Sequence, residues 1–108
     1  MHIERNHHLG QAEAIRKIDA WLNDLLRREW PGGVAVREIS RAWAGNTLNF
    51  SCQANKGFLG TTLSGVLRVN DDTIVLDFDL PGLVTAFVSE DKIQDAIHKE
   101  LNTLFPGA

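Results

Sequence analysis

Cysteine is nearly absent from this chain of 108 residues, which carries Cys52 alone. One thiol cannot form an internal disulfide, so we expect a cytoplasmic protein whose fold is stabilised by its apolar core. Long apolar runs are also missing. No stretch approaches the roughly 18 residues of a membrane-spanning helix, and the N-terminal segment lacks the apolar run of a signal peptide. The sequence therefore predicts neither membrane insertion nor export.

Basic residues are outnumbered by acidic ones, 11 against 14, which gives a formal net charge of -3. A nucleic-acid binder concentrates Lys and Arg on one face to neutralise phosphates, so no nucleic-acid partner is expected. With 44% apolar and 23% charged residues, the composition matches that of ordinary soluble domains. A chain of this length buries roughly two-thirds of its unfolded surface, so residues 1–108 are expected to form a single domain without a metal.

The histidines do not occur at spacings that indicate a metal site. His7 and His8 are adjacent and point in different directions on either a strand or a helix, while His2 and His98 complete no known zinc spacing. We therefore expect all four histidines to lie at the surface and to hold no metal.

Catalytic arrangements are missing too. Asp77 and Asp79 share one strand face, but the sequence places no His or Arg beside them, so we expect a solvated face and no acid–base pair. The serines lack a GxSxG elbow, no Cys-His motif surrounds Cys52, and the glycines form neither a GxGxxG nor a Walker loop. The sequence predicts no catalytic residue and no cofactor, and hence a protein that is not an enzyme.

Two segments, residues 9–28 and 89–105, have the apolar period of amphipathic helices. Apolar residues three and four positions apart make the two stripes: Ala14, Ile15, Ile18, Trp21, Leu22, Leu25 and Leu26, then Ile93, Ala96, Ile97, Leu101 and Leu104. Pro31 and the glycines after it predict the end of the first helix. Ser89 is expected to cap the second, with Glu90 and Asp91 at the positive end of the helix dipole.

The block between these helices alternates with the period of β-strands. Strands are expected at residues 34–43, 47–53, 61–69 and 73–80, with a short first strand at 2–6 and a bulge near Glu38. Residues 44–46 and 70–72 predict tight turns, and residues 55–60 predict a loop. One-sided strands joined by hairpins imply that both helices cover the same apolar face. The predicted fold is an α+β two-layer sandwich, an antiparallel sheet of four to five strands with two helices on one face, in the order (β)αββββα.

Two apolar segments have no clean period: residues 58–59 in the predicted loop and residues 83–88 before the last helix. Exposed apolar clusters in a soluble protein often mark a contact with a partner or with a hydrophobic surface. The candidate contact residues are Phe58, Leu59, Leu83, Val84 and Phe87.

A family resemblance rests on markers spread over most of the chain. These are His8-Leu9-Gly10, Ala14, Arg16, residues 43–50 (WAGNTLNF), residues 65–69 (GVLRV) followed by Asp71 and Asp72, and Ile93, Ile97 and Leu101. Together they resemble the polyhydroxyalkanoic acid system protein family. The resemblance implies a bacterial cytoplasmic protein linked with polyhydroxyalkanoate storage granules, and it brings no catalytic residues. Extra length at residues 31–41 and 54–60 departs from the family pattern, so contacts through those segments cannot be carried over.

Three functions remain open from the sequence. The first is a non-catalytic accessory protein that binds a hydrophobic surface or a protein partner at the granule. The alternative is a small hydrophobic-ligand carrier or enzyme, with a pocket of at least about 300 Å³ between the sheet and the C-terminal helix. That pocket would be lined by Trp43, Phe50, Leu67 and Phe78. Self-association into a homo-oligomer through the free sheet edges is the third possibility.

Overall fold

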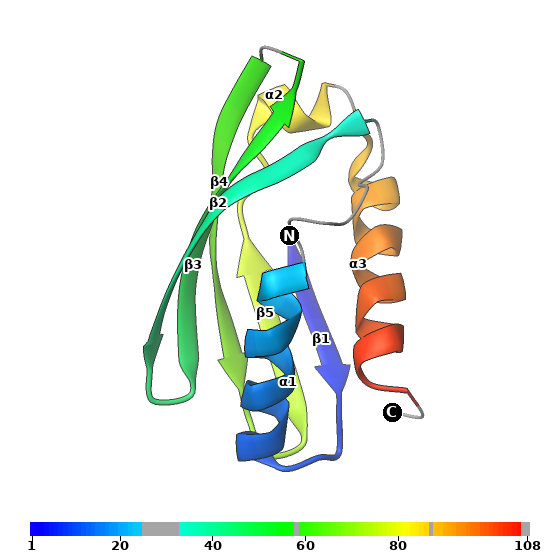
Figure 1. Ribbon diagram of the computed structural model, residues 1–108. Coiled ribbons are helices and arrows are strands. Elements are labelled where there is room, and N and C mark those ends of the chain that lie inside the picture. Colours follow the sequence, from blue (N-terminus) through cyan, green and yellow to red (C-terminus); the bar gives the residue numbers. More distant parts are fainter. Residues whose placement is uncertain (25–32, 58, 87, 107–108) are drawn as a thin grey trace.

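Five strands form one antiparallel sheet in the computed structural model, which describes residues 1–24, 33–57, 59–86 and 88–106 (Figure 1). The strand order is β1-β5-β4-β3-β2, so the first strand pairs with the last. The elements are β1 (His2–Asn6), α1 (Gln11–Asp24), β2 (Ala35–Ala44), β3 (Thr47–Lys56), β4 (Leu59–Val69), β5 (Thr73–Phe78), α2 (Gly82–Thr85) and α3 (Glu90–Leu104). The predicted α+β class and element order are confirmed, with the short helix α2 in addition.

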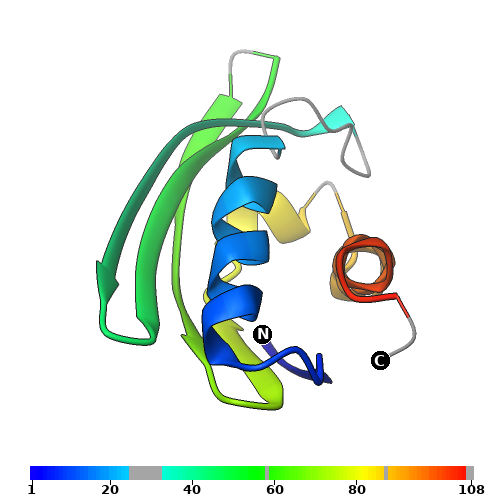
Figure 2. The ribbon, with the colours of Figure 1, turned by 60° about the horizontal axis from the view of Figure 1, so that its bottom comes forward.

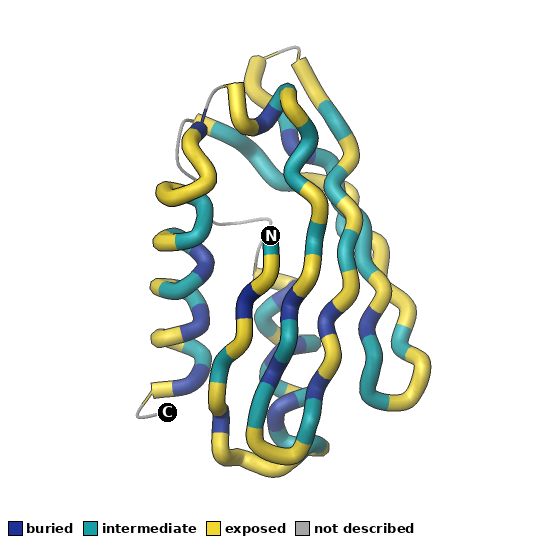
Figure 3. The backbone as a smooth tube through the Cα atoms, turned by 180° about the vertical axis from the view of Figure 1, so that it is seen from behind, coloured by how far each residue is buried: buried dark blue, intermediate teal, exposed yellow. Residues whose placement is uncertain are grey.

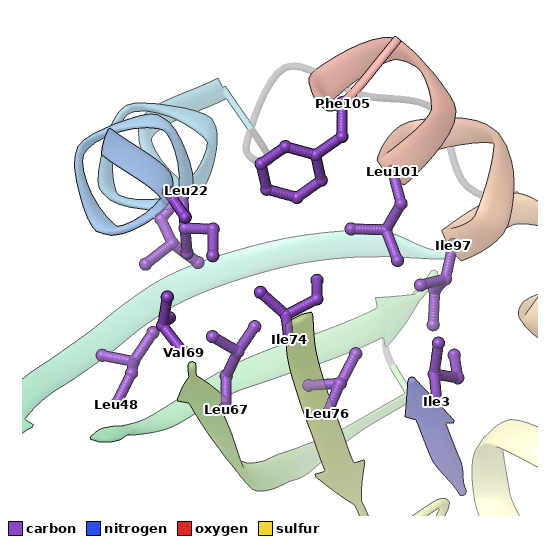
Figure 4. Close-up of a cluster of buried hydrophobic side chains, with 12 residues drawn as sticks. Ile3, Leu22, Leu48, Leu67, Val69, Ile74, Leu76, Ile97, Leu101 and Phe105 are labelled. Carbon is purple, nitrogen blue, oxygen red and sulfur yellow. The ribbon is translucent and has the colours of Figure 1, made fainter. Parts of the chain in front are cut away.

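Helices α1 and α3 lie on the same face of the sheet, as the sequence predicted (Figure 2). Between them and the strands sits a cluster of buried apolar side chains (Figure 4). Its largest fully buried members are Phe105, Ile18, Leu48, Ile74, Leu101 and Val69. These residues come from both helices and from three strands, so burial of their apolar surface joins the two layers.

Helix α3 begins where local chemistry favours it, and α1 has a regular buried stripe. Ser89 precedes α3 with extended backbone, and its hydroxyl accepts a hydrogen bond from the Lys92 amide at 3.4 Å. Glu90 and Asp91 occupy the first turn, where their charge is favourable. In α1, the buried residues Ala14, Ile18 and Leu22 recur every four positions along one face. The predicted cap and both apolar stripes are confirmed over the described residues.

A β-bulge in β2 explains why its apolar pattern is irregular. Arg37 pairs with Gln53 and Ser40 pairs with Ser51. Between these two pairs β2 has two residues where β3 has one, so β2 carries one extra residue. Glu38 in between has a φ of 53°, which few non-glycine residues adopt. Because of the extra residue, Val36 and Ile39 both face inward although they are three positions apart. The bulge predicted near Glu38 is confirmed.

The predicted loop at residues 55–60 is wrong, because β3 and β4 continue almost to their shared turn. Asn55 pairs with Gly60 and Lys56 pairs with Leu59, while Gly57 takes a φ of +62° in the connection. The glycines and polar residues favour a loop locally, but cross-strand pairing with β2 extends the hairpin. Leu59 is therefore held on a strand.

His7 is the exception to the prediction of surface histidines, since only 3% of it is exposed. Its Nε2 donates to the Asn70 carbonyl at 2.9 Å, and its Nδ1 accepts from the Leu9 amide at 3.0 Å. These contacts require the neutral tautomer protonated on Nε2. The ring also lies beside that of Phe105, with the centroids 5.7 Å apart. His7 thus joins the β1–α1 connection to the core and is structural.

Candidate hydrophobic binding site

The inner face of the sheet has a packed half and a hollow half. The cross-strand pair Val69 and Ile74 lies in the packed half and is fully buried. Farther along β3 and β4, the pair Cys52 and Leu63 is only half-buried although it faces the same side. Figure 3 shows the buried positions of the strands concentrated toward one end of the sheet.

An apolar cavity of about 140 Å³ occupies the hollow half. Described residues from α1 to α3 line it: Trp21, Leu22, Val34, Val36, Ile39, Leu48, Phe50, Cys52, Ala54, Leu63, Leu67, Leu76, Phe78, Leu80, Val84, Val88, Ile93 and Ile97. No described lining residue carries a charged side chain. The walls can therefore hold an apolar group and offer no charge for polar chemistry.

The cavity lies along the long strands β3 and β4, which have 10 and 11 residues. Among the described elements, the part of these strands near their shared turn faces α2 and the first turns of α3 (Figure 1). Val84 of α2 and Ile93 of α3 contribute to the cavity wall from that side.

Leu59 and Leu83, two of the predicted contact residues, line a small crevice together with Val84. Leu59 is 37% exposed and Leu83 is half-buried. Val84 is buried, with 7% exposed, and also contributes to the cavity wall. Phe58 and Phe87 lie outside the described residues. The crevice also includes Val34 and Ala54, which belong to the cavity lining as well, so the two spaces adjoin.

Three of the four residues predicted to line a pocket do so: Phe50, Leu67 and Phe78. Trp43 points to α1 instead, where its Nε1 donates to Asp19 Oδ1 at 3.2 Å. The sequence missed Trp21, which replaces it in the wall. The cavity is also smaller than the roughly 300 Å³ expected for a drug-sized ligand.

Two wall residues carry polar atoms. Trp21 Nε1 is buried and has no hydrogen-bond partner in the described structure. A buried donor without an acceptor is costly and uncommon. Cys52 is half-buried in the wall, and desolvation raises the pKa of its thiol, so it is not an activated nucleophile.

Residues 1–105 match the model of the family described as "Putative polyhydroxyalkanoic acid system protein". The chain belongs to this family. The match confirms the resemblance seen in the sequence. The matched residues include those that line the cavity and the crevice and those of the packed half. Neither the comparison with curated proteins nor the comparison with solved structures gave a match.

On the outer face, this polyhydroxyalkanoic acid system protein has a charged cluster that the sequence did not reveal. Pairing of β1 with β5 sets His2 opposite Asp77, with Nδ1 2.5 Å from Asp77 Oδ1 and Nε2 3.1 Å from Glu4 Oε1. These hydrogen bonds, chiefly the one to Asp77, raise the pKa of His2. All three side chains are more than half exposed, and Asp79 is exposed as well, as predicted for a solvated face.

The described residues of this family member contain no group of three or more His, Cys, Asp or Glu that could hold a metal ion. No helix within the described ranges is long and apolar enough to cross a membrane. The feature with a defined shape and chemistry is therefore the apolar cavity with its adjoining crevice.

Proposed function

We propose that the protein is a non-catalytic accessory protein of polyhydroxyalkanoate storage granules in the bacterial cytoplasm, and that it attaches to the hydrophobic surface of the polyester. Membership of the polyhydroxyalkanoic acid system protein family supports a role at polyhydroxyalkanoate granules. The observation that carries the attachment is the placement of Leu59 and Leu83 in one crevice at the same end of the molecule, which we call the contact end.

The contact end has the properties that reversible attachment needs. Leu59 extends from the start of β4, and Leu83 lies in α2 beside it. Each side chain is already partly covered, so each would gain less than the roughly 1.5 to 3 kcal/mol of a full burial on contact with the polyester. Two such gains favour an equilibrium between bound and free protein, without permanent insertion.

Leu59→Asp and Leu83→Asp are each expected to lower the fraction of protein bound to purified granules about tenfold, because a carboxylate would have to leave water at the polyester surface. Co-sedimentation with granules measures the bound fraction, and circular dichroism checks folding.

Leu9→Asp is the matched control. Leu9 is 39% exposed, much like Leu59, but it lies in the β1–α1 connection at the opposite end of the molecule (Figure 1). We expect it to bind like the unmodified chain. Equal losses in all three variants, or binding only to granules that retain their protein coat, would contradict attachment to the polyester through the contact end.

A second candidate function, a carrier of a small hydrophobic ligand, is favoured by the apolar cavity of about 140 Å³. Its size restricts the ligand to a short chain or requires part of the ligand to stay outside.

A further inference from the structure

We propose that the apolar cavity binds the unsubstituted hydrocarbon end of an uncharged small molecule, about six carbon atoms long, and leaves any polar group of that molecule outside its walls. This names the ligand class of the carrier function given above as the second candidate, and it rests on that function. Three observations carry it: the chemistry of the walls, the volume of the cavity and the crevice that adjoins it.

The walls select a part of the ligand that carries no polar atom. Almost the whole surface of the cavity is apolar, and no described lining residue is charged. Trp21 keeps its Nε1 buried within the wall, and Cys52 has only a thiol, which is a weak hydrogen-bonding group. A hydroxyl or carboxylate inside the cavity would lose its hydrogen bonds to water and gain none in return, which is strongly unfavourable.

The same walls exclude a segment of polypeptide as the occupant. Every buried peptide unit needs partners for its N–H and C=O groups. Strand β3, which runs along the cavity, already pairs with β2 on one side and with β4 on the other. A hydrocarbon chain has no such groups to satisfy, so it fits walls that offer no partner.

The volume of the cavity sets the length of the hydrocarbon end. An apolar protein cavity of about 150 Å³ stays dry and binds benzene, which has six carbon atoms. The cavity here is about 140 Å³, so about six carbon atoms fill it. Its wall residues Cys52, Leu63 and Ile93 are only half-buried, so apolar surface remains there for a ligand to cover.

The adjoining crevice gives the other end of the ligand a place near water. Val34, Ala54 and Val84 line both the cavity and the crevice. The crevice wall also includes two uncharged polar residues, Asn55 and Thr61. A ligand that enters from the crevice therefore keeps its polar end beside these residues and the solvent, while its hydrocarbon end fills the cavity.

Titration of the full chain with benzene and with a series of 1-alkanols from propanol to decanol tests the inference, with NMR shifts of the methyl groups in the cavity wall as the readout. Benzene and 1-hexanol should bind with dissociation constants in the millimolar range, because such small ligands make few contacts. Each added CH₂ should lower the dissociation constant about fourfold until the chain has about six carbon atoms. Beyond that length the dissociation constant should level off, because further carbon atoms remain outside.

A comparison of 1-hexanol with 1,6-hexanediol tests whether the buried end must be unsubstituted. The two molecules have the same carbon chain, but either end of the diol would carry a hydroxyl into the cavity. We expect the diol to bind at least about ten times more weakly, because that hydroxyl finds no partner in the walls.

Cys52→Phe should weaken the binding of 1-hexanol at least about tenfold, because the larger ring occupies the space that the ligand needs. Ser51→Phe is the matched control, since it places the same ring on the outer side of β3 and should leave the affinity unchanged. If Cys52→Phe does not fold, nuclear Overhauser contacts in the unmodified chain decide the point. They should join the terminal methyl group of 1-hexanol to the methyl groups of Leu63 and Val84.

No binding of benzene or 1-hexanol, or ligand contacts only with methyl groups outside the wall, would overturn the cavity as a binding site and the carrier function with it. Benzene binding with equal affinities for 1-hexanol and the diol, or affinity that keeps rising through decanol, would overturn the ligand class and leave the carrier function standing. These titrations contain no granules, so neither outcome alters the sedimentation result for Leu59→Asp and Leu83→Asp.

Discussion

Phe105→Ala is expected to lower the free energy of unfolding by about 3 to 5 kcal/mol, the usual cost of removing a buried Phe side chain. Phe105 is 1% exposed, and its ring points between α1 and α3 toward the sheet (Figure 4). It also lies beside the buried ring of His7. Since a domain of this kind has roughly 5 to 15 kcal/mol of total stability, this single change removes a large share. Urea denaturation followed by tryptophan fluorescence measures the loss.

Val66→Ala serves as the comparison for this measurement. Val66 is an exposed apolar residue in β4, on the opposite side of the sheet from the core. Its truncation should change the free energy of unfolding by no more than about 0.5 kcal/mol. If Phe105→Ala cost as little as Val66→Ala, the end of α3 would not be docked against α1 and the sheet as described.

Gly65→Ala should destabilise the protein by about 1 to 3 kcal/mol, as overpacking of a tight site does. A Cβ at this position in β4 would lie 2.5 Å from the Asp77 carbonyl oxygen and from Phe78 Cβ, and 2.8 Å from Phe50 Cζ. The first of these is backbone of the paired strand β5, so the strands themselves would have to shift.

The sign of this effect is informative, because Ala normally stabilises the interior of a strand relative to Gly by roughly 0.5 to 1 kcal/mol. Gly82→Ala in α2 provides a control, since no atom lies within 4 Å of a Cβ built there. We expect Gly82→Ala to be neutral or mildly stabilising in the same urea titration. A Gly65→Ala variant more stable than the unmodified chain would show that Phe50 and Phe78 do not close over this glycine.

The fold could be predicted where a local rule and the tertiary environment agree. Ser89 with Glu90 and Asp91 marked the start of α3, and the broken alternation around Glu38 marked the bulge. His7 could not be placed, because its burial depends on the backbone groups of Leu9 and on the distant Asn70. The hairpin beyond Asn55 was missed for a similar reason: its pairing is set by the neighbouring strands.

The candidate site was predicted in part. Alternation along the strands identified Phe50, Leu67 and Phe78 as inward residues that could line a pocket, and all three line the cavity. Trp21 lines the cavity and Trp43 does not, because Trp43 donates to Asp19 of α1, and the local sequence does not encode this contact between β2 and α1. Whether the inner face is filled or hollow depends on how the helices pack against it, so the cavity itself had no sequence signal.

The stability of a Cys52→Phe variant tests the hollow inner face most directly. Cys52 lines the cavity, and a larger apolar side chain there should fill empty space and raise the free energy of unfolding by about 1 kcal/mol. Ser51→Phe, at the neighbouring position on the outer side of β3, controls for the strand preference of Phe and should change stability by no more than about 0.5 kcal/mol. If Cys52→Phe instead destabilises the protein by about 1 to 3 kcal/mol, the space is already filled and the cavity does not exist in solution.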